Sequence, residues 1–161
     1  MTPQKASMLD ARHLWSARSR TLTAPRDLAV VLGSVVNLPM KYWQPNFFFF
    51  GAPDHRLSQL SSGAFPAVTV PGKSHPVFTL RSLPDGVGFT VCPCSSKGPF
   101  DVEKYRFIRK GCHLGHSRYE MDRNSYLVEK IRINMPPDTG GRLRFKGEVP
   151  EKCIEVRTTR F

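Results

Sequence analysis

Three segments of this chain hold side chains that can do chemistry, and the first is Pro71-Gly72-Lys73-Ser74-His75-Pro76. A tight turn here would present Lys73 and His75 just before a strand begins. Histidine titrates near neutral pH, so His75 can move a proton, and the lysine ammonium can hold a phosphate. The run is not a phosphate-binding loop, because that loop needs a glycine five residues before Gly72, where Ala67 stands. A surface histidine in a turn, without a chemical role, is the alternative.

The second segment, residues 92–97, reads Cys-Pro-Cys-Ser-Ser-Lys and leads from a predicted strand into a loop. Together with Cys112, His113 and His116, its two cysteines could supply the four ligands of a zinc site. Structural zinc sites usually space their paired cysteines more widely, however, and buried cysteines are common core residues. We therefore expect inert core thiols, and neither a metal ion nor another cofactor.

The third segment is a polar stretch that precedes a predicted strand. Its charges of both signs are typical of a solvated loop, which is the simplest interpretation. Beside a basic groove, its arginines and asparagine would instead contact phosphates or bases. The residues concerned are Arg118, Glu120, Asp122, Arg123, Asn124 and Ser125.

Short strands joined by turns are predicted to position these side chains. The chain has 14 prolines and 12 glycines, which disfavour a helical bundle. The Pro84-Asp85-Gly86 turn predicts a hairpin, because proline fixes φ, aspartate bonds its own backbone and glycine accepts a positive φ. Strands are expected at residues 67–70, 76–82, 87–92, 105–109, 125–133 and 141–146, and residues 150–157 fit either a helix or a strand. Strands of this length and spacing predict a small β-barrel or sandwich.

The first 63 residues differ in composition and are interpreted as an N-terminal extension before a β-barrel domain at residues 64–161. Residues 1–26 are polar and basic, and form either a frayed helix over residues 10–20 or a disordered segment. Residues 27–36 are apolar but too short to span a membrane. The four phenylalanines at residues 47–50 cannot all face one side of a strand, and we expect them to pack an arm onto the domain core.

The net charge is the strongest global signal. Among 161 residues, Lys and Arg number 24 and Asp and Glu 13, which gives +11 and favours polyanionic partners. The excess is spread along the chain, as on a folded surface. A hydrophobic content of 40% excludes the disordered class, and the pattern excludes collagen-like and coiled-coil chains. Without a recognisable secretory signal, we expect a soluble cytoplasmic protein in a reducing compartment.

Four segments in sequence order resemble the PemK/MazF-like toxin family. They are residues 75–81 (His-Pro-Val-Phe-Thr-Leu-Arg), 91–96 (Val-Cys-Pro-Cys-Ser-Ser), 124–133 and 147–150 (Gly-Glu-Val-Pro), and the resemblance covers roughly residues 64–157. It implies an SH3-like β-barrel with one or two short helices that pairs as a homodimer. It also implies a metal-independent endoribonuclease that cuts single-stranded RNA and is neutralised by an acidic antitoxin.

The same resemblance implies the site residues. The family's Ser/Thr falls on Ser95, and its catalytic arginine falls on His75, which can act as a base or an acid or, when protonated, as a cation. Bases would stack on Tyr105 or Tyr126. The expected RNA-binding residues are Lys73, Arg81, Ser96, Lys97 and Arg123. Because a histidine replaces the arginine, a catalytically inactive barrel that binds nucleic acid or protein is the second hypothesis, and a zinc-stabilised structural module is the third.

Overall fold

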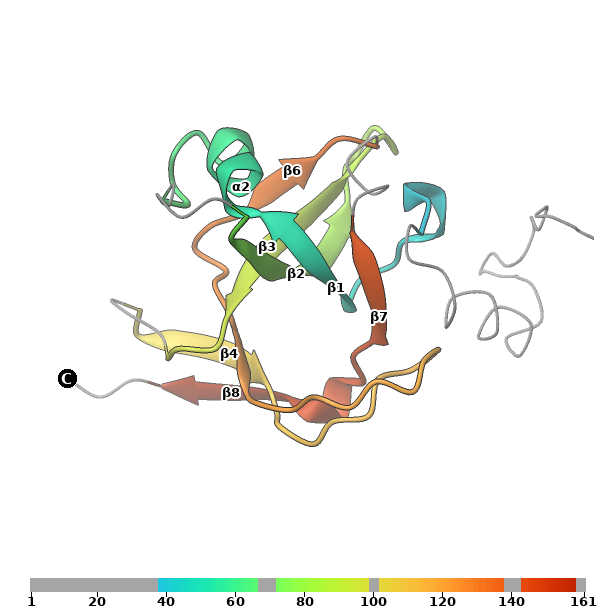
Figure 1. Ribbon diagram of the computed structural model, residues 1–161, viewed down its shortest axis with the longest axis vertical. Helices are drawn as coiled ribbons and strands as arrows, with labels where there is room; N and C mark the ends of the chain where they lie inside the picture. The colour runs from blue at the N-terminus through green and yellow to red at the C-terminus, as the bar shows by residue number, and fades with distance from the viewer. Residues whose placement is uncertain (1–37, 67–71, 99–101, 138–142, 159–161) are drawn as a thin grey trace, which may run out of the picture.

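Strands make up most of the regular structure in the computed structural model, which describes residues 38–66, 72–98, 102–137 and 143–158 (Figure 1). The elements in chain order are the 3-10 helix η1 (Met40–Tyr42), β1 (Phe47–Pro53), α2 (Asp54–Leu60), β2 (Ser74–Ser82), β3 (Phe89–Ser95), β4 (Lys104–Ile108), β5 (Ser125–Leu127), β6 (Ile133–Met135), β7 (Arg144–Glu148), the 3-10 helix η3 (Glu151–Cys153) and β8 (Ile154–Thr158). The mainly β class expected from the sequence is confirmed. The predictions for residues 1–36 and for a strand at 67–70 lie outside the described residues.

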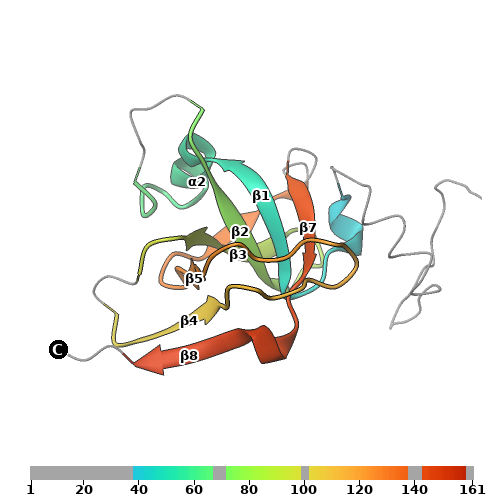
Figure 2. The same cartoon turned by 60° about the horizontal axis from the view of Figure 1, so that its bottom comes forward.

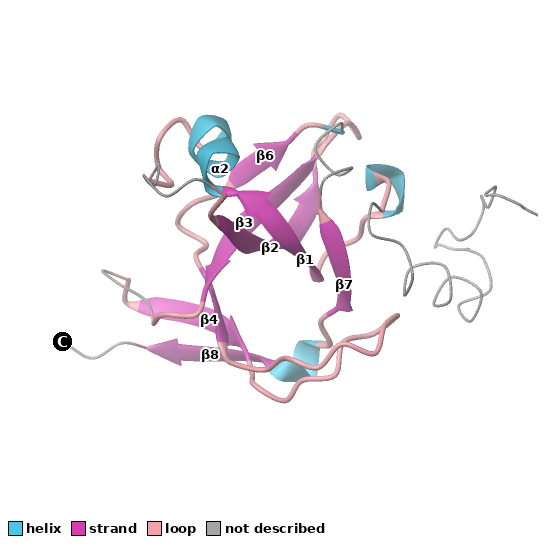
Figure 3. Cartoon of the chain, in the orientation of Figure 1, coloured by secondary structure: helices cyan, strands magenta, loops and turns pink. Residues whose placement is uncertain are grey.

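The strands form one antiparallel sheet that curls into a half-barrel. Its order is β7-β1-β2-β3-β5-β4-β8, and β6 pairs with the same edge of β3 as β5 does. Figure 3 shows β1, β2, β3, β6 and β7 at one end of the molecule and β4 and β8 at the other. Figure 2 shows the same separation from another side, with β5 between β3 and β4.

Strand β1 explains the phenylalanine run. Successive side chains of a strand point to opposite faces, so Phe47 and Phe49 enter one hydrophobic core and Phe48 enters a second. The prediction that these rings cannot share one side is confirmed. Because β1 lies between β2 and β7, the segment assigned to an N-terminal arm is an interior strand of the sheet. Residues 47–60 therefore belong to the same folded unit as the later strands.

Two cores lie on opposite faces of the sheet. The first packs under η1, α2 and β6, and contains Trp43, Leu57 and Ile133. The second fills the inside of the curl, where Phe78 of β2, Ile108 of β4 and Leu127 of β5 meet. Because β1, β2 and β3 contribute side chains to both cores, they are packed on both faces. Residues at the ends of these strands are therefore held rigidly.

The predicted hairpin is confirmed, but the long strand at 125–133 is wrong. Asp85 Oδ1 accepts a hydrogen bond of 2.8 Å from the Val87 N–H, and Gly86 has a φ of +74°. The expected long strand divides into β5 and β6, which pair with different parts of β3. The break lies at Pro93, whose carbonyl accepts from the Val128 N–H at 2.9 Å but which has no N–H to return.

A long loop, residues 109–124, closes the curl between its two end strands. Its Gly115 exchanges two backbone hydrogen bonds with Glu148 of β7, at 2.7 and 3.0 Å. Its Cys112 forms a disulfide with Cys153, beside β8, with a Cα–Cα distance of 5.9 Å. The close approach requires Gly147, whose φ is +138° and where a Cβ would lie 2.6 Å from Leu114 Cβ. The loop therefore docks on both ends of the sheet.

Two further expectations bear on where the protein resides. Within the described ranges, none of the helices has the length and apolar character to cross a membrane. The disulfide is unexpected, because such bonds are rare in reducing compartments, so a cytoplasmic location stays a prediction.

Candidate active site

Asp54 and His75 form a hydrogen-bonded pair where β1, α2 and β2 meet. His75 Nδ1 lies 2.7 Å from Asp54 Oδ1, and the side chains are 27% and 1% exposed, respectively. The register of β1 and β2 sets this contact, because Pro53 lies opposite Ser74 and Asp54 follows directly. The Phe65 ring packs edge-on against the imidazole at 5.2 Å. The imidazole is thus fixed from two sides.

The pair is suited to proton transfer. When the Asp54 carboxylate accepts the Nδ1–H, the neutral imidazole keeps its lone pair on Nε2. The carboxylate also stabilises the imidazolium that forms when Nε2 takes up a proton. Within the described part of the chain, Asp54 Oδ2 is buried without a hydrogen-bond partner, while Oδ1 contacts His75.

His75 lines a cavity of about 360 Å³, which we call the His75 cavity. Its lining residues come from β1, from the start of β2, from the end of β3, and from the 109–124 loop and the start of β5. The lining combines cations, hydroxyls and aromatic rings, among them Lys73, Ser96, Phe50, Tyr119 and Arg123. Its volume is within the usual range for ligand sites.

Lys146, which lies outside the cavity lining, contacts the aromatic wall of the His75 cavity. The rings of Phe50 and Tyr119 meet edge to face at 5.6 Å, and Lys146 Nζ lies 5.0 and 4.7 Å from their centroids. Burial, and then the charge of Asp122, raises the pKa of Tyr119, so its hydroxyl stays protonated. Asp122 itself lies 3.4 Å from Arg123, and both side chains are 67% exposed. This part of the lining therefore combines aromatic rings with the cation Arg123 and its ion-pair partner Asp122.

The structure divides the sequence-predicted site residues between two cavities. Lys73, His75, Ser96 and Arg123 share the His75 cavity. Ser95 and Lys97 line a different cavity of about 100 Å³. The expected pairing of His75 with Ser95 is therefore not observed, because neighbouring residues at the end of β3 face opposite ways.

The remaining predicted residues are placed as follows. Arg81 lies opposite Thr90 near the far end of β2 and lines neither cavity. Tyr105 and Tyr126, expected to stack on bases, line the cavity of Ser95. We call this second site the tyrosine cavity.

Two residues of the candidate site escape sequence reasoning: Asp54, which bonds to His75 from outside the cavity lining, and Tyr119, which lines the His75 cavity. Asp54 reads as an ordinary acidic residue at the start of a helix, and its partner is 21 residues away. The Pro53-Asp54 step was the available signal, since a strand ending there would deliver a carboxylate to its neighbour. Tyr119 lies in the 109–124 loop, and no local sequence pattern predicts that this loop docks on β7.

The cysteines do not form a metal site. Cys112 is bound to Cys153, while Cys92 and Cys94 are free thiols in the second core. Burial raises the pKa of both thiols well above the ordinary value, which disfavours the thiolate that a metal needs. In the described ranges, no group of three or more His, Cys, Asp or Glu side chains is placed to hold a metal ion.

No protein-family model matches the sequence, and searches of curated proteins and of solved structures find no match either.

Proposed function

We propose that this protein is a PemK/MazF-like endoribonuclease that cuts single-stranded RNA in the His75 cavity without a metal ion. The observation that carries the proposal is the Asp54–His75 pair on the wall of a cavity that also holds Lys73 and Arg123. A fixed imidazole beside cations is suited to cleaving a phosphodiester through its neighbouring 2′-hydroxyl.

The proposed reaction begins at Nε2 of His75, which takes the proton of the 2′-hydroxyl. The 2′-oxygen then forms a bond to phosphorus, and the bond from phosphorus to the 5′-oxygen breaks. The leaving oxygen takes a proton from the Tyr119 hydroxyl, which is later restored from His75 through solvent. The products are a 2′,3′-cyclic phosphate and a 5′-hydroxyl end, so the reaction needs no water molecule as a reactant.

The other lining residues hold the phosphate and the base. Lys73 and Arg123 stabilise the charge that builds up on the phosphate oxygens. Ser96, in the role expected of Ser95, donates a hydrogen bond to one of these oxygens. The rings of Phe50 and Tyr119 offer a surface on which a base of the single strand stacks.

The family resemblance adds the rest of the proposal. The curled sheet, closed by the 109–124 loop, is compatible with an SH3-like barrel. A homodimer and an acidic antitoxin are the expected partners, and a net charge of +11 favours both an acidic protein and RNA.

The test is cleavage of a mixed-sequence RNA by the purified chain in buffer containing EDTA. We expect His75→Ala to lower the rate by roughly 100-fold or more, because it removes the general base. His113→Ala is the matched control, since the His113 side chain is 79% exposed and lines neither cavity. Analysis of the product ends should show the cyclic phosphate.

Other results would overturn the proposal in different ways. Equal cleavage by wild type and His75→Ala would place the activity elsewhere or in a contaminant. If the wild type binds RNA in a salt-dependent manner but cuts none, the chain is the inactive binding barrel of the second hypothesis. Cleavage that appears only after a divalent metal is added would remove the metal-independent mechanism.

A further inference from the structure

The tyrosine cavity is a compact site whose walls differ from those of the His75 cavity. The Tyr105 and Tyr126 rings lie 5.8 Å apart at 51°, and both side chains are half-buried. They project from neighbouring strands, because Tyr126 pairs with Phe107, two residues along β4 from Tyr105. Ring contacts of 6.2 and 5.4 Å with Phe107 hold the two tyrosines in place.

A carboxylate lines the same cavity. Glu129 accepts two hydrogen bonds from Arg106, of 3.1 and 2.6 Å, and its side chain is 25% exposed. This bidentate pair fixes the carboxylate, and the hydrogen bond with Glu129 is the main reason that the pKa of Arg106 is raised. Lys97 and Lys104 also line the cavity and are exposed.

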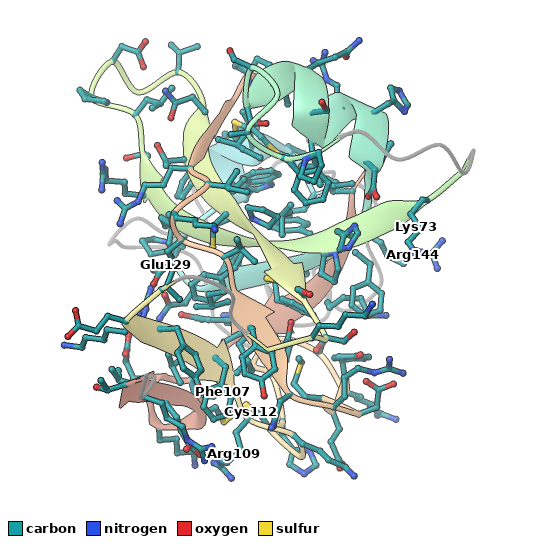
Figure 4. All side chains as sticks on the ribbon, turned by 90° about the vertical axis from the view of Figure 1, so that its left-hand side faces the viewer. Lys73, Phe107, Arg109, Cys112, Glu129 and Arg144 are labelled. Carbon is teal, nitrogen blue, oxygen red and sulfur yellow. A yellow bond between two sulfur atoms is a disulfide. The ribbon has the colours of Figure 1, made fainter. Side chains whose placement is uncertain are left out.

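The two cavities share the end of β3 as a common wall. Ser96 lines the His75 cavity, while its neighbour Ser95 lines the tyrosine cavity. Figure 4 shows Lys73 of the first cavity and Glu129 of the second at opposite edges of that view. A single strand of RNA that crosses the end of β3 would therefore meet both sites in succession.

We propose that the tyrosine cavity binds one nucleobase, of a kind that carries an exocyclic amino group, of the RNA strand that is cleaved in the His75 cavity. This inference rests on the proposed function for the identity of that strand. The cavity of about 100 Å³ suits one flat ring rather than a whole nucleotide. Tyrosine rings stack on any base, whereas a fixed carboxylate accepts hydrogen bonds only from amino or imino groups.

The sugar and phosphate would lie at the lysine side of the cavity. Lys97 and Lys104 line the cavity and attract the phosphate of a bound nucleotide. Cytosine, adenine and guanine carry the amino group, whereas uracil offers only its imino N–H, which lies between two carbonyl oxygens that the carboxylate repels. Discrimination against uracil is therefore the signature of this site.

Binding of ribonucleoside monophosphates to the wild-type chain tests the site without any cleavage. We expect cytidine monophosphate to bind about tenfold more tightly than uridine monophosphate, with NMR shifts at Tyr105 and Tyr126. Tyr105→Leu should abolish binding and Tyr105→Phe should retain it, because stacking needs the ring and not the hydroxyl. Glu129→Gln should remove the preference for cytosine. Lys152→Ala, in η3 and outside both cavities, is the control.

The outcomes separate this inference from the proposed function. Equal affinity for the two nucleotides, or displacement of both by inorganic phosphate alone, would overturn the base site. His75→Ala should bind cytidine monophosphate like wild type, since His75 lines the other cavity. If RNA is cleaved but neither nucleotide binds, the base site fails and the endoribonuclease stands. If cytidine monophosphate binds selectively but RNA is not cleaved, the reverse holds.

Discussion

The carboxylate of Asp54 lies 2.7 Å from Nδ1 of His75 because two antiparallel strands place them there. Asp54 is also the first residue of α2, where a negative charge interacts favourably with the helix dipole. The same side chain therefore starts a helix and orients a candidate catalytic imidazole.

Replacing Asp54 by asparagine separates orientation from substrate binding. Asp54→Asn keeps the shape of the side chain but presents a neutral amide to His75, which no longer stabilises the imidazolium. We expect kcat for RNA cleavage to fall by roughly 100-fold while KM changes little, because Asp54 does not line the His75 cavity. Steady-state kinetics on a defined single-stranded RNA measure both constants.

The exposed Asp85 of the hairpin turn provides the control. Asp85→Asn should leave kcat and KM at wild-type values. A folded Asp54→Asn variant with wild-type kcat would show that the carboxylate has no positioning role.

Gly147 determines whether the 109–124 loop can dock. In Gly147→Ala the new Cβ would meet Leu114 Cβ at 2.6 Å and the Gly115 carbonyl oxygen at 2.8 Å, on a backbone with φ of +138°. We expect the free energy of unfolding to fall by roughly 3 kcal/mol, from overpacking and backbone strain together. Urea denaturation measures this loss of stability. When the loop does not dock, its Tyr119 and Arg123 should no longer line the His75 cavity.

Gly63→Ala separates the two causes. Gly63 has a φ of +86° but no atom within 4 Å of an added Cβ, so it suffers strain without a clash. We expect it to cost roughly 1 kcal/mol. Equal losses for the two variants would mean that the loop does not need the close approach.

The two free thiols give stability a defined pH dependence. Burial raises the pKa of Cys92 and Cys94 above the ordinary value of 9.0, so the folded state keeps protons that the unfolded state releases. The contribution of the two thiols to the free energy of unfolding is fully present below pH 9 and is lost as the pH rises above 9. We expect the free energy of unfolding to fall by roughly 1 kcal/mol per pH unit for each thiol. Denaturation in urea between pH 8 and 10 measures the slope.

A double variant, Cys92→Ala with Cys94→Ala, should lose that part of the slope and keep the part due to other groups. Thiol titration of the unreduced, denatured wild type should find two reactive groups per chain, since Cys112 and Cys153 are joined. An unchanged slope in the double variant would refute the assignment.

The sequence predicts those features that depend on neighbouring residues. The β2–β3 turn follows from Pro84-Asp85-Gly86, and the two-sided burial of β1 follows from the alternation of a strand. Residues 150–157 were ambiguous because they form both η3 and β8 in succession. The break between β5 and β6 was missed, because it depends on Pro93 in a different strand.

The candidate site was predicted only in part, for a related reason. The residue types of His75 and Lys73 and their place in a turn mark them as candidates. Which of Ser95 and Ser96 lines the His75 cavity depends on a difference of one residue along the strand. Asp54 and Tyr119 reach the site through tertiary pairing, of β1 with β2 and of the loop with β7. Sequence spacing gives no measure of such long-range contacts.

The anchoring of the 109–124 loop near the end of the chain has a consequence during synthesis. Its two attachments, at Glu148 and Cys153, are among the last described residues that a ribosome adds. A growing chain holds Asp54 and His75 long before the loop that lines part of the His75 cavity can be fastened. The cavity can therefore acquire its full set of walls only after Glu148 and Cys153 have been synthesised and the loop has docked on them.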